Sequence, residues 1–256
     1  MDLKGKIVFV TGASAGIGRA TALAFAAEGA RLLLAARRVG KLVEVASECL
    51  KRGAAAVHSI DLDVRDHRAV QNAIDTLPEE WAEIDVLVNN AGLSRGLDKL
   101  YTGRVEDWEE MIDTNVKGLL YVTRGVVPGM VVRGRGHIVS LGSTAGELAY
   151  PGGAVYCGTK AAERLINDGL RQDVLGTPVR VTSVDPGMVE TDFSLVRFRG
   201  DNERAAKVYK GITPLAPEDV AEVILWATKQ PDHVNIARVT MTTVHQANSI
   251  LFHREG

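Results

Sequence analysis

The chain has 256 residues, of which 46% are hydrophobic and 24% are charged, and its formal net charge is −2. It can therefore fill a large core, and its charge balance argues against nucleic acid or an anionic membrane as a partner. A small molecule is the expected partner, and one domain over residues 1–256 is the expected organisation, since doubly wound sheets commonly reach ~250 residues.

Short aliphatic or β-branched runs alternate with longer amphipathic stretches along almost the whole chain. The runs predict seven strands, at residues 6–10, 31–36, 55–60, 85–89, 136–141, 179–184 and 237–243. The amphipathic stretches predict helices at 16–28, 41–51, 65–76, 105–127, 155–175 and 217–229. Continuous apolar strands that alternate with helices are typical of a parallel sheet covered on both faces. We expect a single Rossmann-like α/β domain, doubly wound with right-handed crossovers.

No linker or repeat divides the chain, and the least regular segment is 189–215. Loops of that length are usually functional or disordered. This segment is the predicted substrate lid.

A glycine-rich turn follows the first strand directly and opens the first helix. Glycines allow a tight turn and close approach to a pyrophosphate, which the free amides at a helix N-terminus stabilise. Such a turn can also serve packing alone, but the strand before it and the helix after it favour nucleotide binding. The predicted contacts are Gly12, Ser14, Gly16, Ile17 and Gly18.

The end of the second strand indicates which dinucleotide is bound. NAD-binding folds usually carry an acid there for the adenosine ribose hydroxyl, whereas this strand ends in Ala36, Arg37 and Arg38. Two guanidinium groups suit a 2′-phosphate. The predicted cofactor is therefore NADP(H), although two solvated arginines at a helix entry are also common.

Polar residues follow the third and fourth strands, where open α/β sheets bind ligands. Asp63 and Val64 come after the third strand, and Asn90 after the fourth. We expect Asp63 to accept a bond from the adenine amine and Asn90 to support the turn beneath the cofactor. Singly, each could equally be a cap or turn residue.

A possible catalytic set lies in the second half of the chain. Tyr156 and Lys160 are four residues apart on one helix face, and Ser143 follows the fifth strand. A tyrosine with an ordinary pKa of about 10 is a poor base at neutral pH, but an adjacent ammonium would stabilise its phenolate. Ser143 would orient the substrate oxygen, and Asn115 is a further polar candidate within the helix at 105–127.

Over nearly its whole length the chain resembles the short-chain dehydrogenase/reductase family, through TGASAGIG, NNAG, Asn115, Ser143, Tyr156 with Lys160, and Asp185-Pro186-Gly187. The resemblance implies Tyr156 as general acid/base, Lys160 also on the nicotinamide ribose, and Asn115 supporting a proton-relay water. It further implies that the nicotinamide loop contacts the cofactor through Pro186, Gly187, Val189 and Thr191.

The stretches VETDFSLVRFRGD and TPLAPEDVAEVILWAT resemble a subgroup of NADP-dependent 3-hydroxy acid dehydrogenases that includes serine 3-dehydrogenases. This implies oxidation of the β-hydroxyl of serine or 3-hydroxyisobutyrate. A buried substrate carboxylate would need a cation, for which Arg197 and Arg199 are candidates. Broad reduction of neutral ketones or aldehydes is the alternative activity, and a noncatalytic NADP sensor is disfavoured by the retained Ser143, Tyr156 and Lys160.

The remaining expectations concern metal, assembly and compartment. The histidines and cysteines lack metal-ligand spacing, so no metal is predicted. The family resemblance implies a homotetramer joined through the helices at 105–127 and 155–175. The early apolar run leaves no room for a signal peptide, no stretch reaches the ~20 apolar residues of a membrane span, and Cys49 and Cys157 are expected as free thiols. The expected location is the cytoplasm.

Overall fold

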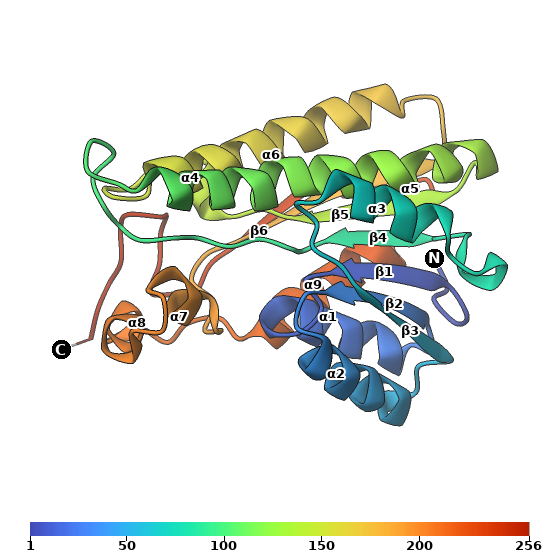
Figure 1. The fold of residues 1–256 in the computed structure, drawn as a ribbon, viewed down its shortest axis with the longest axis horizontal. Helices are drawn as coiled ribbons and strands as arrows, with labels where there is room; N and C mark the ends of the chain where they lie inside the picture. The colour runs from blue at the N-terminus through green and yellow to red at the C-terminus, as the bar shows by residue number, and fades with distance from the viewer. Residues whose placement is uncertain (256) are drawn as a thin grey trace.

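The sheet predicted from the sequence is present, with every strand parallel to its neighbours. The computed structural model describes residues 1–255. Figure 1 shows the sheet between two layers of helices. Its strands are β1 (Ile7–Thr11), β2 (Arg31–Ala36), β3 (Ala56–Asp61), β4 (Val86–Asn89), β5 (Gly136–Leu141), β6 (Val179–Pro186) and β7 (Arg238–Met241).

The strands lie in the order β3-β2-β1-β4-β5-β6-β7. The order reverses between β1 and β4, and a parallel sheet of this kind binds ligands beyond the carboxyl ends of its strands at such a reversal. The prediction of a single doubly wound domain is confirmed.

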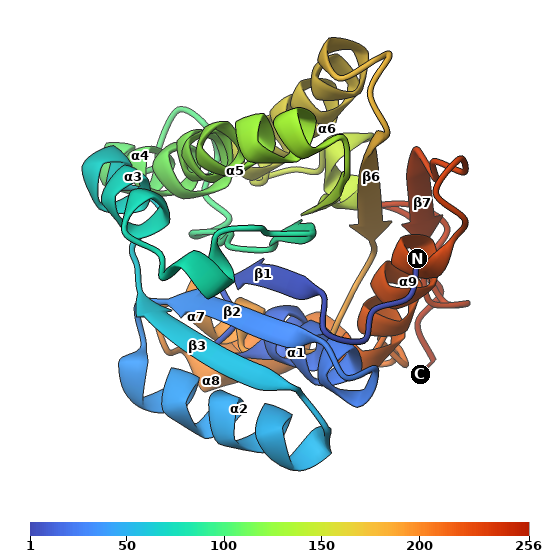
Figure 2. The same cartoon turned by 90° about the vertical axis from the view of Figure 1, so that its right-hand side faces the viewer.

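Helices cover both faces of the sheet, as Figures 1 and 2 show. One face carries α1 (Gly16–Ala27), α2 (Val39–Arg52) and α9 (Pro217–Lys229). The other carries α3 (His67–Asp75), α4 (Val105–Ile112), α5 (Leu119–Arg133) and α6 (Ala154–Asp173). Short 3₁₀ turns, η1 (Glu79–Trp81) and η3 (Thr144–Gly146), follow α3 and β5.

The core explains why the strands are apolar along their whole length. In β1, Val8 and Val10 pack into the cluster on the α1 side, and Phe9 packs into the cluster on the α5 side. Both faces of the strand are therefore buried, which removes the polar alternation of a half-exposed strand. The central strands consequently hold their carboxyl ends rigidly.

The predicted helix at 105–127 differs from the structure. It is divided into α4 and α5 by a π turn, η2 (Asp113–Gly118), which contains Asn115. The Asn115 amide is bonded to Leu93 and Thr159, outside its own helix. Turns of this kind are rare in proteins, and those that occur often lie at functional sites.

The segment 189–215 contains α7 (Phe193–Arg197) and α8 (Asn202–Tyr209). Val189 pairs with Leu215 in an isolated parallel bridge, which joins the two ends of the segment. The segment therefore leaves the domain and returns to it at the same place. Figure 1 shows α7 and α8 together, apart from the two helical layers.

Among residues 1–255, no helix combines the length and the apolar character that crossing a membrane requires.

Candidate active site

A cavity of about 870 Å³ lies at the carboxyl ends of the strands. Its lining includes Gly12 and Arg38 from the first two strand ends, Tyr156 and Lys160 from α6, and Arg197 from α7. A cavity of this size suits a small-molecule ligand. All of the predicted nucleotide and catalytic residues except Gly18 and Asn115 line this one pocket.

The glycine turn is shaped for close approach of a ligand. Gly12 and Gly16 adopt left-handed φ values of +65° and +52°, which glycine tolerates without strain. The Asn90 side chain donates to the carbonyl oxygens of Thr11 and Gly12 at 2.9 and 3.2 Å. A Cβ on Gly18 would lie 2.4 Å from Asn90 Nδ2. The packed turn leaves the N-terminus of α1 open toward the cavity, and this fits a pyrophosphate.

Basic side chains gather beside this turn. Arg38 Nε donates to Ser14 Oγ at 3.2 Å, and Lys41 joins it in facing the Asp192 carboxylate, at 3.7 Å from Lys41 and 3.8 Å from Arg38. This cluster fits a phosphorylated ribose. The sequence analysis predicted neither Lys41 nor Asp192. Lys41 could have been found from its place one turn after Arg38, but no local pattern indicates Asp192.

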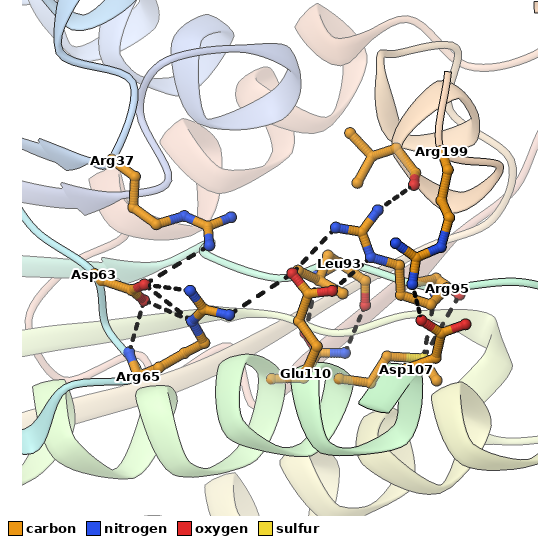
Figure 3. A network of polar contacts seen from close by, with 12 residues as sticks. Arg37, Asp63, Arg65, Leu93, Arg95, Asp107, Glu110 and Arg199 are labelled. Atoms are coloured by element: carbon orange, nitrogen blue, oxygen red, sulfur yellow. Dashed lines mark hydrogen bonds and ion pairs between the residues drawn. The ribbon is translucent and has the colours of Figure 1, made fainter. Parts of the chain in front are cut away.

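An alternating series of charges runs from the turn after β3 toward the lid (Figure 3). Asp63 Oδ2 lies 3.7 Å from Arg37 Nη1 and 2.6 Å from Arg65 Nη2. Partial burial opposes ionisation of Asp63, but the bonds from Arg65 outweigh it and lower the carboxyl pKa. Asp63 is thus an ionised acceptor at the predicted adenine end, with Val64 beside it in the cavity wall.

The series ends at α7. Glu110 lies 3.7 Å from Arg65 and 2.6 Å from Arg95, whose guanidinium lowers the pKa of the Glu110 carboxyl. Arg95 also donates to the carbonyl oxygen of Val196 in α7 at 2.5 Å. The sequence analysis did not single out Arg95 or Glu110, because they are fifteen positions apart and meet only in the folded chain.

Ser143 stands at the end of β5 as the N-terminal cap of η3. Its Oγ accepts from the backbone amide of Ala145 at 3.1 Å. A hydroxyl that accepts this bond still has its own proton to donate. Ser143 can therefore donate into the cavity that it lines.

The Asn115 side chain is buried beside the cavity and does not line it. Its Oδ1 accepts from Leu93 N at 2.9 Å, and its Nδ2 donates to Leu93 O at 2.8 Å and to Thr159 Oγ1 at 3.0 Å. Thr159 in turn donates to the carbonyl oxygen of Tyr156. The side chain thus links the segment after β4 to the first turn of α6.

Tyr156 and Lys160 are both buried at the start of α6. Lys160 Nζ donates to the carbonyl oxygen of Leu141 at 2.6 Å and to Glu163 Oε2 at 2.8 Å. Burial opposes the charge on Lys160, but Glu163 outweighs it, so the pKa of Lys160 is raised. Glu163 was not singled out in the sequence, although its place three residues after Lys160 puts it on the same helix face.

The loop after β6 lies against the C-terminal tail. Gly187 N donates to Met241 O, and Met188 N donates to Gln246 Oε1, both at 2.8 Å. A Cβ on Gly187 would lie 2.0 Å from Gln246 Oε1. The cavity wall includes the predicted loop residues Pro186, Gly187, Val189 and Thr191.

The two lid arginines have different surroundings. Arg199 forms an ion pair with Asp107 of α4. Arg197 instead donates to the hydroxyl of Tyr150 at 2.9 Å, and its guanidinium carbon lies 5.3 Å from the centre of the Tyr156 ring. Its Nε is buried without a partner within residues 1–255. Of the two, Arg197 is the cation that faces Tyr156.

Comparison with known proteins gives consistent relatives. A family model described as short chain dehydrogenase matches residues 6–201. An NADP-dependent 3-hydroxy acid dehydrogenase, YdfG of Salmonella typhi, is 48% identical over 242 residues, which are 94% of this chain and 96% of that protein. An NADP-dependent 3-hydroxy acid dehydrogenase of Schizosaccharomyces pombe is 44% identical over 248 residues, 96% of each chain.

Solved structures agree with these relatives. The closed form of a serine dehydrogenase complexed with NADP+ superimposes with a TM-score of 0.90 at 46% identity, covering 97% of this chain and 100% of that one. An alcohol dehydrogenase from the archaeon Thermococcus sibiricus, complexed with 5-hydroxy-NADP, gives a TM-score of 0.82 at 28% identity over 95% of this chain and 98% of that one.

Proposed function

Because the chain belongs to the short-chain dehydrogenase family, we propose that it oxidises the β-hydroxyl of a small 3-hydroxy acid and reduces the matching 3-oxo acid. It is an NADP-dependent oxidoreductase that acts on CH–OH groups, like the relatives it matches. Serine and 3-hydroxyisobutyrate are the proposed substrates. The observation that carries this choice is the environment of Arg197.

Arg197 is a cation in an aromatic pocket. Its guanidinium carbon lies 5.1 Å from the Phe193 ring centre and 5.9 Å from that of Tyr150. Burial raises the pKa of the Tyr150 hydroxyl, so the group bonded to Arg197 stays neutral. No carboxylate of residues 1–255 pairs with this guanidinium within 4.0 Å. A substrate carboxylate would supply the missing opposite charge through strong charge-assisted bonds.

The roles of the reacting groups follow from their positions. Bound NADP+ supplies the hydride acceptor. As a phenolate that the Lys160 ammonium stabilises, Tyr156 takes the proton of the substrate hydroxyl and becomes a neutral phenol. Ser143 donates a hydrogen bond to the substrate oxygen and so holds it in line. Asn115 keeps the start of α6 in place through Thr159 and supports the relay water that the family resemblance implies.

The cofactor is proposed to bind along the strand ends. The glycine turn would hold the pyrophosphate, Arg38 with Ser14 and Arg37 the 2′-phosphate, and Asp63 the adenine. Lys160 would bond the nicotinamide ribose. The whole proposed set is Gly12, Ser14, Gly16, Ile17, Gly18, Arg37, Arg38, Asp63, Val64, Asn90, Tyr156, Lys160, Pro186, Gly187, Val189 and Thr191.

Broad reduction of neutral ketones and aldehydes is the alternative, and the aromatic wall formed by Tyr150 and Phe193 favours it. Such a wall binds apolar groups without needing a charge. The two activities differ in whether the substrate carboxylate matters.

Initial rates of NADP+ reduction, followed by absorbance, distinguish these activities. We expect serine and 3-hydroxyisobutyrate to be preferred over a neutral secondary alcohol, and the activity to be lost in Tyr156→Phe, which keeps the ring but removes the proton acceptor. Equal or better turnover of the neutral alcohol would reject the 3-hydroxy acid in favour of a general carbonyl reductase.

Substitution of the lid arginines tests carboxylate recognition. In Arg197→Ala, kcat/KM for 3-hydroxyisobutyrate should fall by roughly 10–100-fold, as loss of a charge-assisted bond implies, with a much smaller fall for the neutral alcohol. Arg199→Ala is the matched control, because Asp107 already occupies that guanidinium. Equal losses for both substrates in Arg197→Ala would contradict recognition through Arg197.

Substitution of Arg38 tests the proposed phosphate contact. Arg38→Ala should raise KM for NADP+ by about tenfold or more while leaving KM for NAD+ nearly unchanged, since only NADP+ carries the 2′-phosphate. Arg52→Ala, at the exposed far end of α2, serves as the control. The contact is wrong if both cofactors are affected alike.

We also propose a homotetramer that works in the cytoplasm. The helices of the predicted interface expose Ile112, Leu120 and Leu165, and apolar side chains gathered on helices suit subunit contacts. Cys49 and Cys157 are both free and buried, as suits a reducing compartment. Light scattering should give the mass of four chains, and a monomeric mass would refute the assembly.

A further inference from the structure

Glu163 is a buried acid to which the proposed reaction assigns no role. It lies one turn beyond Lys160 on α6, and its Oε2 is 2.8 Å from Lys160 Nζ. Its side chain is 2% exposed, and its other oxygen, Oε1, has no hydrogen-bond partner within residues 1–255. Burying a carboxylate with one oxygen unsatisfied costs free energy that an apolar residue would avoid. Packing alone therefore gives no reason for a glutamate here.

The charged groups around the pair come from several elements. Tyr156 acts on Lys160 from α6 itself, and Asp185 acts on both Lys160 and Glu163 from β6. Asp185 accepts a hydrogen bond from Ser183 and lies 3.4 Å from Arg238 of β7, which offsets its charge. From β5 the Lys160 ammonium has one hydrogen-bond acceptor among residues 1–255, the Leu141 carbonyl oxygen. Glu163 is thus the carboxylate in direct contact with the ammonium.

The balance of charge at Lys160 depends on this contact. A fully buried lysine tends to lose its proton, and its pKa can fall by several units. Burial does act in that direction on Lys160, but the Glu163 carboxylate reverses it and raises the pKa. Burial raises the pKa of Glu163 itself to about 7, against the lowering effect of Lys160. Above neutral pH the pair is an ammonium facing a carboxylate.

We propose that Glu163 is a positioning residue that keeps Lys160 charged and directed along the start of α6, so that the ammonium can stabilise the Tyr156 phenolate. This inference rests on the roles proposed above for Tyr156 and Lys160. Without the carboxylate, Lys160 loses its proton and Tyr156 loses the neighbouring positive charge. Alcohol oxidation then requires a higher pH.

The pH dependence of kcat in Glu163→Gln tests this role, because glutamine keeps the size and the acceptor oxygen but removes the charge. We expect kcat at neutral pH to fall about tenfold or more, with KM for the alcohol nearly unchanged and the acid limb displaced upward by one pH unit or more. Activity should recover at high pH, and Glu163→Asp should be intermediate. Asp173→Asn removes an exposed acid at the end of α6 and should keep the wild-type profile.

A second readout needs neither substrate nor cofactor. In infrared difference titration, wild-type protein and Asp173→Asn should lose a protonated-carboxyl band as the pH rises through about 7, and Glu163→Gln should lack that band. A uniform fall of kcat at every pH in Glu163→Gln, or an unchanged profile, would overturn the inference. If Glu163→Gln does not fold, Glu163→Asp carries the kinetic test. An acid limb of kcat that does not shift in Glu163→Asp would then reject the proposed role of Glu163.

Failure of the inference differs from failure of the proposed function. An active Tyr156→Phe would remove the premise that Tyr156 is the proton acceptor. An inactive Tyr156→Phe beside an unshifted Glu163→Gln would reject the role of Glu163 alone.

Discussion

The site depends on the parallel arrangement of the strands, which brings all of their carboxyl ends to one edge of the sheet. Where the strand order reverses between β1 and β4, the chains leave in opposite directions and open a crevice. The glycine turn after β1, Asn90 after β4, Ser143 just after β5 and Pro186 at the end of β6 meet there because each lies at the carboxyl end of its strand. Burial of both sheet faces keeps these ends fixed.

The basic side chains of the crevice differ in whether a carboxylate of the chain pairs with them. Arg95, Arg199 and Lys160 each have a carboxylate partner within the chain, in Glu110, Asp107 and Glu163. The first pair lies beside α7, the second joins Arg199 to α4, and the third lies one turn from Tyr156 on α6. Arg197 is directed at the same tyrosine but rests on a neutral hydroxyl and aromatic rings. Because no carboxylate of residues 1–255 pairs with Arg197, we propose it as the partner of the substrate carboxylate.

The strands, the glycine turn and the Tyr156–Lys160 spacing could be predicted because each is a local pattern with a physical cause. Contacts between distant segments could not. Arg95 meets Glu110 only through the fold, Asp192 meets Arg38 only when the lid is placed, and the choice between Arg197 and Arg199 depends on Asp107 of α4. The π turn at Asn115 was also missed, since helical periodicity does not reveal one extra residue in a turn. Glu163 had a usable signal in its spacing from Lys160, but burial gives that spacing its meaning.

The most direct measurement is a crystal structure of the ternary complex with NADP+ and an unreactive 3-hydroxy acid analogue. The substrate carboxylate should lie within hydrogen-bond distance of the Arg197 guanidinium, and the hydroxyl oxygen should contact both Tyr156 Oη and Ser143 Oγ. A carboxylate left in solvent, with Arg197 still bonded only to Tyr150, would contradict the assignment of a 3-hydroxy acid as substrate.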